Sequence, residues 1–165
     1  EVVQSAGLDS RSTIQCFDWR VLRIVQELDS GIATGALTDQ QPGEDTILGD
    51  LSGPSPWLGG LDIHDYQGSV PRLAKASGAA HWSPHYLDLS AELVREAQEL
   101  GLQVIPWTVN EPGDMERIVR WGGDGMISDR PDHLRTVLQQ LGLEVPSPVA
   151  AAATAVADAG WADQS

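Results

Sequence analysis

The chain has 165 residues, of which 41% are hydrophobic, and this is enough apolar material for the core of one ordinary domain. No apolar run approaches the roughly 20 residues that cross a bilayer, so the sequence predicts no transmembrane segment. The 10 basic and 24 acidic residues give a net charge of −14, which argues against nucleic acid or an anionic membrane surface as a partner.

Cysteine usage and the first residues further bound the class of protein. Cys16 is the only cysteine, which excludes an internal disulfide framework and a cysteine-based zinc site. The chain begins at Glu1 without a charged-then-apolar leader, and EVVQSAGLDSRSTI is typical of a helix end that runs into a strand. We therefore expect the natural N-terminus to precede Glu1. Neither the compartment nor the oligomeric state follows from the sequence.

The first part of the chain predicts two strands around one helix, followed by a long loop. Residues 12–17, STIQCF, form an apolar, β-branched run suited to a buried strand. Asp18 is a candidate N-cap for the helix that follows, in which apolar residues recur at helical spacing. Residues 31–38 are a second strand candidate, weakened by Gly35. Residues 39–68 are rich in Gly, Pro, Asp and Ser, which indicates a functional or excursion loop.

The rest of the chain alternates helices and strands. Helices are expected at residues 69–79, 89–101, 112–120 and 131–141, and strands at residues 79–83, 103–109 and 124–128. Proline in the first turn or glycine after the last turn marks these helices, while Pro106 weakens the strand that contains it. We expect the domain to span residues 1–143, followed by a disordered tail rich in Ala and Pro at residues 144–165.

Alternating strands and helices predict parallel strands joined by helical crossovers, hence an α/β fold with five strands. An open doubly wound sheet and a barrel both fit this order. No glycine fingerprint follows a strand, and polar or aromatic residues stand at the carboxyl ends of several strands, which favours the barrel. These rim residues are Gln15, Cys16, Phe17, Asp18, Thr38, Asp39, His81, Trp82, Ser83, Trp107, Thr108, Val109, Asn110, Ser128 and Asp129.

The rim residues form no recognisable catalytic core, because no paired carboxylates flank an apolar pocket and no glycine-rich phosphate loop occurs. His64 and Asp65 are interpreted as a solvated pair in the loop. His81 and His85 do not form a helical metal pair, because a proline lies between them. His133 is expected at the surface.

Five rim residues have competing interpretations. Trp107 and Phe17 either cap the core or line a pocket, and the pattern alone leaves both open. Asn110 and Asp129 are favoured as N-caps or first-turn anions of the helices that follow them. Cys16 is most simply a small buried apolar residue, since no neighbouring histidine base can be placed.

The stretch VIPWTVNEPGDMERIVRWGGDGMISDRPDHLR, residues 104–135, carries the most specific pattern: a strand ending in W-T-V-N, a short helix, and D-G-M-I-S-D-R-P. This stretch resembles the C-terminal region of the glycerophosphodiester phosphodiesterase family. Upstream, STIQCFDWRVLRIVQEL resembles the family's strand and helix with Q-S-F-D, and GIATGALT resembles the next strand. The order and spacing agree from about residue 1 to residue 143.

The resemblance implies a (β/α)8 TIM-type barrel, in which this chain would supply the C-terminal five βα units and so form an incomplete barrel. It implies hydrolysis of a small-molecule glycerophosphodiester to an alcohol and glycerol 3-phosphate, with a divalent cation, Ca²⁺ or Mg²⁺, as cofactor. The family's H-R-G, E-x-D and E-x-K motifs, which carry its catalytic histidines and metal ligands, do not occur in this sequence. We therefore expect no catalytic residue, no metal ligand and no activity in this chain alone.

The resemblance transfers roles to four residues. Phe17 and Trp107 match family positions that line the substrate pocket, where apolar surface packs against the glycerol. Gln15 and Asn110 match positions that we assign to support of the rim.

Two positions depart from the family pattern. Cys16 replaces the usual serine, which is nearly isosteric. Gly123 replaces the usual valine, and we expect the lost methyl groups to cost about 1–2 kcal/mol of stability. Two alternatives to the family's activity stay open: a non-catalytic binding module on a degenerate barrel, and a phosphodiesterase related to phospholipase C.

Overall fold

The computed structural model describes residues 2–145 and residue 147, so the predicted tail at residues 144–165 lies almost entirely outside the described residues. The helices are α1 (Val2–Ser5), α2 (Trp19–Leu28), α3 (Val70–Ala76), α4 (Ala91–Glu99), α5 (Pro112–Trp121) and α6 (Pro131–Gln140). Short 3-10 helices are η1 (Asp9–Arg11), η2 (Ile63–Tyr66) and η3 (Tyr86–Asp88). The strands are β1 (Thr13–Cys16), β2 (Ala33–Thr38), β3 (His81–Pro84) and β4 (Gln103–Val104).

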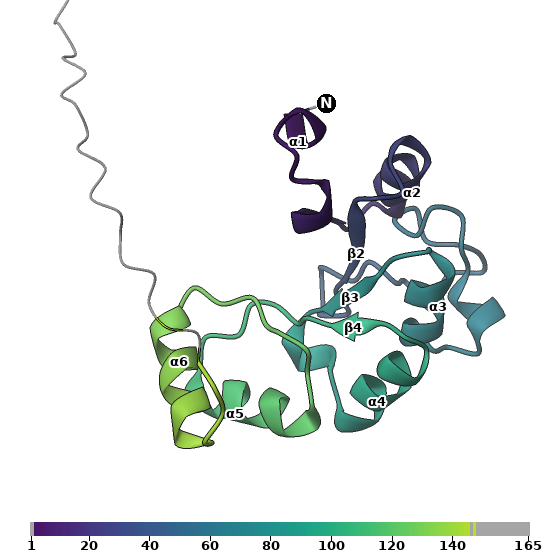
Figure 1. Cartoon of the computed structure of the whole chain (residues 1–165). Coiled ribbons are helices and arrows are strands. Elements are labelled where there is room, and N and C mark those ends of the chain that lie inside the picture. The colour runs from purple at the N-terminus through teal and green to yellow at the C-terminus, as the bar shows by residue number, and fades with distance from the viewer. Residues whose placement is uncertain (1, 146, 148–165) are drawn as a thin grey trace, which may run out of the picture.

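The four strands form one parallel sheet in the order β1-β2-β3-β4, which confirms the predicted α/β class. Helix α2 packs against β1 and β2, α3 against β3, and α4 against β4. Figure 1 shows α2 to α6 following one another along an arc outside the sheet, the arrangement of part of a (β/α)8 barrel. Within the described part of the chain, no helix is long and apolar enough to cross a membrane.

The hydrophobic core lies between the sheet and these helices. Strands β2 to β4 and helices α2 to α5 contribute side chains with almost no exposed surface: Ala36, Trp82, Val104, Leu22, Leu73, Val94, Met115 and Ile118. The predicted N-cap at Asp18 is confirmed, because its carboxylate accepts a hydrogen bond from the backbone N–H of Arg20 at 3.0 Å. Caps of this kind fix where each helix begins and therefore which face it turns to the sheet.

The two last predicted strands differ from the structure. The strand predicted at residues 103–109 is regular only at Gln103–Val104, because Pro106 has no N–H to donate to the ladder. Residues 124–128, predicted as a fifth strand, are not a regular strand among the described residues. They still run beside residues 104–109: Ile127 N–H donates to Pro106 O, and Val109 N–H donates to Ile127 O, each at 2.9 Å.

The expected place of His81 at a carboxyl end is wrong. His81 opens β3, at the amino edge of the sheet, and pairs in register with Gln103. Its Nδ1 is buried without a hydrogen-bond partner among the described residues. Burial lowers the pKa of His81, while the charge of Asp124 and a hydrogen bond with Gln103 oppose that shift. His81 therefore lies at the amino edge of the sheet, opposite the carboxyl edge at which it was expected.

The expected cost of glycine at position 123 is also wrong. A Cβ at Gly123 would meet the Ile118 Cγ2 atom at 2.9 Å, and Ile118 is fully buried. The tight packing of α5 against this turn leaves no room for a valine side chain, so glycine fits the site rather than leaving a void there.

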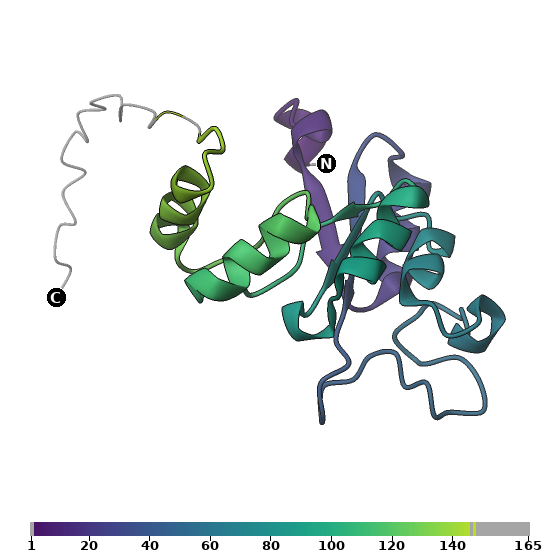
Figure 2. The ribbon, with the colours of Figure 1, turned by 90° about the horizontal axis from the view of Figure 1, so that it is seen from below.

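The long segment at residues 39–68 is a folded loop that contains η2 and projects from one side of the molecule (Figure 2). Its base is closed by two bonds: Thr46 N–H donates to Asp39 O at 2.8 Å, and Asp39 N–H donates to Thr46 Oγ1 at 3.1 Å. The Ser55 hydroxyl then donates to Thr46 O at 2.6 Å. Three of its apolar side chains are buried: Ile47, Leu58 and Ile63. The loop is thereby held against the end of β2.

Candidate functional site

The site lies at the carboxyl edge of the sheet, where the chain leaves successive parallel strands. Phe17 directly follows β1, Asp39 follows β2, and His85 follows β3. Trp107 lies three residues beyond β4 and forms an isolated parallel bridge with His85. Because parallel strands end at the same edge, these side chains meet although they are up to 90 residues apart (107 − 17).

Phe17 and Trp107 are in direct contact. Their ring centroids are 5.4 Å apart and the rings stand at 87°, the edge-to-face arrangement that aromatic pairs prefer. The Trp107 indole N–H donates to Ser83 O at 2.8 Å, and the centroid of the His85 imidazole lies 5.2 Å from that of the Trp107 ring. Both rings are half-buried, so the pair presents a fixed apolar surface that still reaches solvent.

Gln15 extends from β1 across β2, and its side-chain amide donates to the buried Ser83 hydroxyl at 3.3 Å. Gly35 makes this possible, because a Cβ there would come within 2.9 Å of Gln15 Cγ. The glycine that weakened the strand prediction therefore provides room for a side chain at the rim.

Asn110 bonds to the turn before α6 rather than capping a helix. Its side-chain oxygen accepts the Asp129 N–H at 2.9 Å and the Ser128 hydroxyl at 3.2 Å, and its amide donates to the Asp129 carboxylate at 3.0 Å. The predicted N-caps are therefore wrong: Glu111 and Arg130 occupy these positions, without a side-chain cap bond. Asn110 and Asp129 were misread because their mutual bonds join segments 19 residues apart.

The first turn of α6 contains one carboxyl group with a strongly lowered pKa. The Arg130 guanidinium hydrogen-bonds to Asp132 and lowers the pKa of that carboxyl to about 2, so Asp132 stays ionised at any physiological pH. His133 lies beside them, with Nε2 at 2.6 Å from an Arg130 nitrogen, and its ring is partly exposed as predicted. These contacts hold the start of α6 against Asn110.

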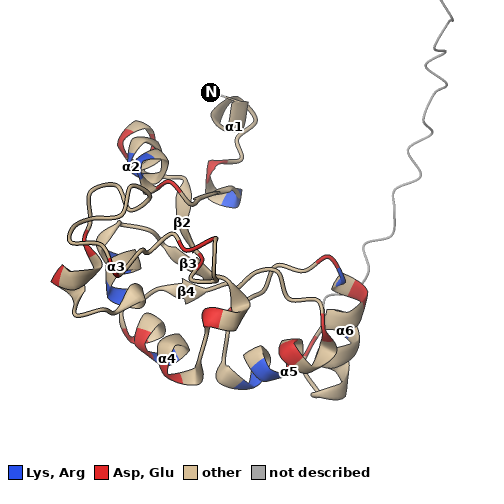
Figure 3. Ribbon diagram, turned by 180° about the vertical axis from the view of Figure 1, so that it is seen from behind, with Lys and Arg blue, Asp and Glu red and all other residues tan. Residues whose placement is uncertain are grey.

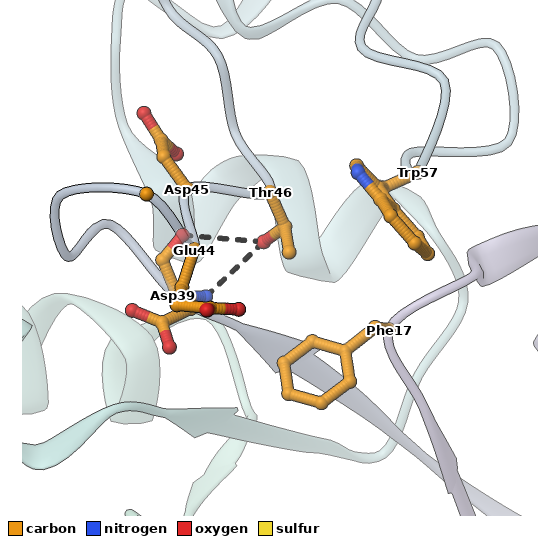
Figure 4. A pocket seen from close by; sticks show the side chains of 7 residues that line it. Phe17, Asp39, Glu44, Asp45, Thr46 and Trp57 are labelled. Carbon is orange, nitrogen blue, oxygen red and sulfur yellow. Dashed lines mark hydrogen bonds between the residues drawn. The ribbon is translucent and has the colours of Figure 1, made fainter.

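A solvent-accessible hollow of about 210 Å³ opens beside Phe17, between the end of β2 and the long loop. Its side-chain lining is Phe17, Asp39, Glu44, Asp45, Thr46 and Trp57, and we call it the acidic hollow. Figure 4 shows the three carboxylates on one side, the two aromatic rings on the other, and Thr46 between them. No lysine, arginine or histidine lines it, in keeping with the excess of acidic residues over the ribbon in Figure 3.

One group of side chains could hold a divalent cation. Donor atoms of Asp39, His85 and Asp88 lie within 4.8 Å of one another, and this is the only such group in the described part of the chain. Asp88 accepts hydrogen bonds from the Gln40 N–H at 2.8 Å and from the Gln41 side-chain amide. Asp39 accepts the Gln41 N–H at 2.8 Å. Both carboxylates are thus fixed in place by donors of the loop.

Most residues of the acidic hollow and of the possible cation group are not predicted from the sequence. Asp39 was recognised at a strand end, but His85 was considered only with His81, which lies at the opposite edge. Asp88, Glu44 and Trp57 carried no signal of their own, because the folding of the long loop brings them to the rim. The sequence does contain a signal for His85. His85 follows β3 and Asp39 follows β2, and these two strands are neighbours in the sheet.

The remaining candidates lie apart from this arrangement. His64 is exposed in η2, with Nδ1 3.6 Å from Asp62, and neither it nor Asp65 lines the acidic hollow. Cys16 is partly buried and packs against the core. None of these three residues lines the acidic hollow.

Comparisons with known proteins identify relatives of this chain. The model of the glycerophosphoryl diester phosphodiesterase family matches residues 1–133. Among curated proteins, a glycerophosphodiester phosphodiesterase of Caldanaerobacter subterraneus subsp. tengcongensis is 37% identical over 59 residues, which are 36% of this chain and 24% of that protein.

Solved structures show the same likeness. A glycerophosphoryl diester phosphodiesterase structure from Silicibacter pomeroyi DSS-3 matches with a TM-score of 0.71 and 30% identity, covering 86% of this chain and 42% of that one. A phosphodiesterase from Oleispira antarctica, solved with the product sn-glycerol-3-phosphate, matches with a TM-score of 0.53 and 20% identity over 77% and 41%. The chain therefore spans less than half the length of these relatives.

Proposed function

The chain belongs to the glycerophosphoryl diester phosphodiesterase family, and we propose that the protein containing it hydrolyses a glycerophosphodiester to an alcohol and glycerol 3-phosphate. The observation that carries this proposal is the contact between Phe17 and Trp107, which stand together at the carboxyl edge of the sheet. The resemblance to the family implies that the substrate packs against these two positions. The glycerol 3-phosphate bound to the Oleispira relative is the kind of product that we propose here.

The side chains of this chain would bind and orient the substrate. Phe17 and Trp107 offer an apolar surface on which the carbon chain of the glycerol packs and from which water is excluded. Gln15, bonded to Ser83, and Asn110, bonded to the turn before α6, hold the two ends of that surface in place. Substrate and transition state have the same glycerol carbons, so this surface lowers KM more than it raises kcat.

We propose that the reaction depends on a divalent cation, Ca²⁺ or Mg²⁺, which when bound would neutralise charge on the phosphate. Asp39, His85 and Asp88 offer three donors, whereas Ca²⁺ takes six to eight oxygen ligands and Mg²⁺ prefers oxygens in an octahedron. Their carboxylates also already accept loop N–H groups. This group alone does not fit the family's cation, so we assign no step to it and expect the catalytic ligands in segments not covered by this chain.

The test is product analysis with the complete natural protein and glycerophosphocholine, with Ca²⁺ and Mg²⁺ in separate assays. We expect equal amounts of glycerol 3-phosphate and choline, and none after chelation of the cation. The 165-residue chain assayed beside it should release none.

Other products would contradict the proposal. Release of phosphocholine and glycerol would mean cleavage of the other phosphate ester bond, which is the reaction of a different diesterase. No turnover of any glycerophosphodiester above a heat-inactivated control would favour the binding module on a degenerate barrel.

A further inference from the structure

We propose that the acidic hollow binds an alkylammonium group and thereby selects glycerophosphodiesters with a cationic alcohol, such as choline, over those with a neutral one. This inference rests on the proposed function, because it names the substrate class of the same site. It is carried by the residues that line the hollow and by its place beside the aromatic pair.

The aromatic side of the hollow suits a cation that carries methyl groups. Phe17 and Trp57 stand on the same side in Figure 4, and Trp57 as a residue is 42% exposed, which is unusual for so large an apolar residue. Trp57 is held in place by its backbone, because Trp57 O accepts the Trp19 N–H at 2.8 Å. Aromatic faces attract quaternary ammonium groups through the negative potential of their π-systems.

The opposite side of the hollow supplies negative charge. Asp39 is only 7% exposed and is fixed by the Gln41 N–H, and Asp45 is fixed by the N–H groups of Ile47 and Leu48. The Glu44 side chain is exposed, and its carboxylate makes no hydrogen bond or ion pair with any residue that the structure describes. Among the described residues, no lysine, arginine or histidine lines the hollow to neutralise these carboxylates there.

The spacing of these carboxylates favours a large organic cation over a metal ion. A metal ion needs donor atoms that converge on one point, and the only convergent group in the described residues is Asp39 with His85 and Asp88. Glu44 and Asp45 do not belong to it. Three carboxylates distributed over one side of a hollow of about 210 Å³ instead match the diffuse charge of an alkylammonium group.

The position of the hollow links it to the diester site. Phe17 lines the hollow and also contacts Trp107, whose surface we assign to the glycerol. A substrate that places its glycerol on Trp107 can therefore extend its alcohol past Phe17 into the hollow. The hollow would bind the charged group of the alcohol without taking part in hydrolysis.

The experiment uses the complete natural protein and two probes of the same shape, choline and its neutral analogue 3,3-dimethylbutan-1-ol. The indole ¹H–¹⁵N signal of Trp57, assigned with Trp57→Phe, is followed by NMR at constant ionic strength. We expect choline to shift this signal with saturation and the neutral alcohol to leave it in place. Three results would overturn the proposal: no shift with choline, equal shifts with both probes, or a shift with Ca²⁺ only.

A matched pair of charge variants tests the carboxylates. Glu44→Gln should weaken choline binding by about two- to fivefold, the range for one partly solvated charge. Asp50→Asn removes one exposed charge elsewhere in the same loop and should leave the affinity unchanged. Equal losses of choline affinity in the two variants would mean that only the net charge of the loop attracts choline, and this would contradict a defined binding site in the acidic hollow.

The same protein distinguishes this inference from the proposed function. Choline binding without hydrolysis of any glycerophosphodiester would refute the diesterase proposal and leave the alkylammonium site standing. Hydrolysis with equal kcat/KM for glycerophosphocholine and glycerophosphoglycerol, without a choline-dependent shift, would refute the alkylammonium site alone.

Discussion

Gly123 and Gly113 differ in the space around them, although both lie near helix α5. A Cβ at Gly123 would stand 2.9 Å from the buried Ile118 side chain, whereas a Cβ at Gly113 would meet nothing within 4 Å. We expect Gly123→Ala to lower the free energy of unfolding by about 1 kcal/mol or more through overpacking. Gly113→Ala should raise it by about 0.5–1 kcal/mol by restricting the unfolded chain.

Urea denaturation followed by circular dichroism measures both changes. A higher free energy of unfolding in Gly123→Ala would mean that Ile118 moves aside at little cost. Glycine at this position would then lower the stability of the chain, as the sequence predicts. Gly113→Ala serves as the control, because it makes the same chemical change in open space.

Single residues were predictable where their role follows from chain position alone. Asp18 caps α2 as predicted, since a cap acts on the N–H groups of its own helix. Phe17 and Trp107 were predicted as rim residues on the same basis, and their contact follows from the parallel sheet. Asn110, His81 and Gly123 were misread, because their surroundings come from segments that are remote or closely packed in three dimensions.

At the scale of elements, Ser69 and Ser90 provide a comparison between two helix caps. Ser90 Oγ accepts the Leu93 N–H at 3.3 Å, and Ser69 Oγ accepts the Arg72 N–H at 3.2 Å. Only Ser69 also donates to a neighbouring helix, to Glu96 of α4 at 2.9 Å. Ser90 also bonds to Glu92, but that carboxylate is exposed on the same helix. We expect Ser90→Ala to cost about 1 kcal/mol and Ser69→Ala about 2 kcal/mol, because only the second loses a cap together with a bond between helices to a partly buried carboxylate.

Double-variant analysis separates the two contributions of Ser69. In a Glu96→Gln background, the cost of Ser69→Ala should fall towards that of Ser90→Ala, as judged by thermal or urea unfolding. An unchanged difference would mean that the bond between α3 and α4 contributes nothing to stability.

Helices were predicted more closely than strands. Proline, serine and glycine signals lie within the helices or next to them, so the predicted bounds of α5 and α6 agree with the structure to one residue. The last two strands were overestimated, because Pro106 interrupts the ladder and the paired segment 124–128 is held by scattered bonds. The acidic hollow was not predicted, since it depends on bonds such as that between Asp39 and Thr46 that close a long loop.

At the scale of the whole molecule, the outer edge of β1 is an exposed apolar region. Among the described residues β1 pairs only with β2, and Val2 and Leu28, which line one shallow surface with Ile14 of β1, are 83% and 79% exposed. Unpaired strand edges beside apolar side chains favour association between chains. We expect the 165-residue chain to bind the dye ANS and to self-associate at micromolar concentration.

Sedimentation velocity and ANS fluorescence test this expectation, with Leu28→Lys as the variant that places a charge in the region. The variant should bind less dye and shift the chain towards monomer. A wild-type chain that sediments as a dye-free monomer would show that this edge is covered in solution.

The proposed function requires Phe17 and Trp107 to form the wall against which the glycerol of the substrate packs. The most direct measurement compares the kinetics of the complete protein with those of Trp107→Ala, with Trp107→Phe as the conservative variant and Trp121→Ala as an unrelated tryptophan loss. Each variant is first checked for cooperative unfolding above the assay temperature. We expect KM for glycerophosphocholine to rise about tenfold in Trp107→Ala with kcat little changed, since losing part of an apolar wall costs about 1.4 kcal/mol of binding. Trp107→Phe should recover most of the loss, and Trp121→Ala should match the wild type. A folded Trp107→Ala variant with unchanged KM and kcat would contradict the account.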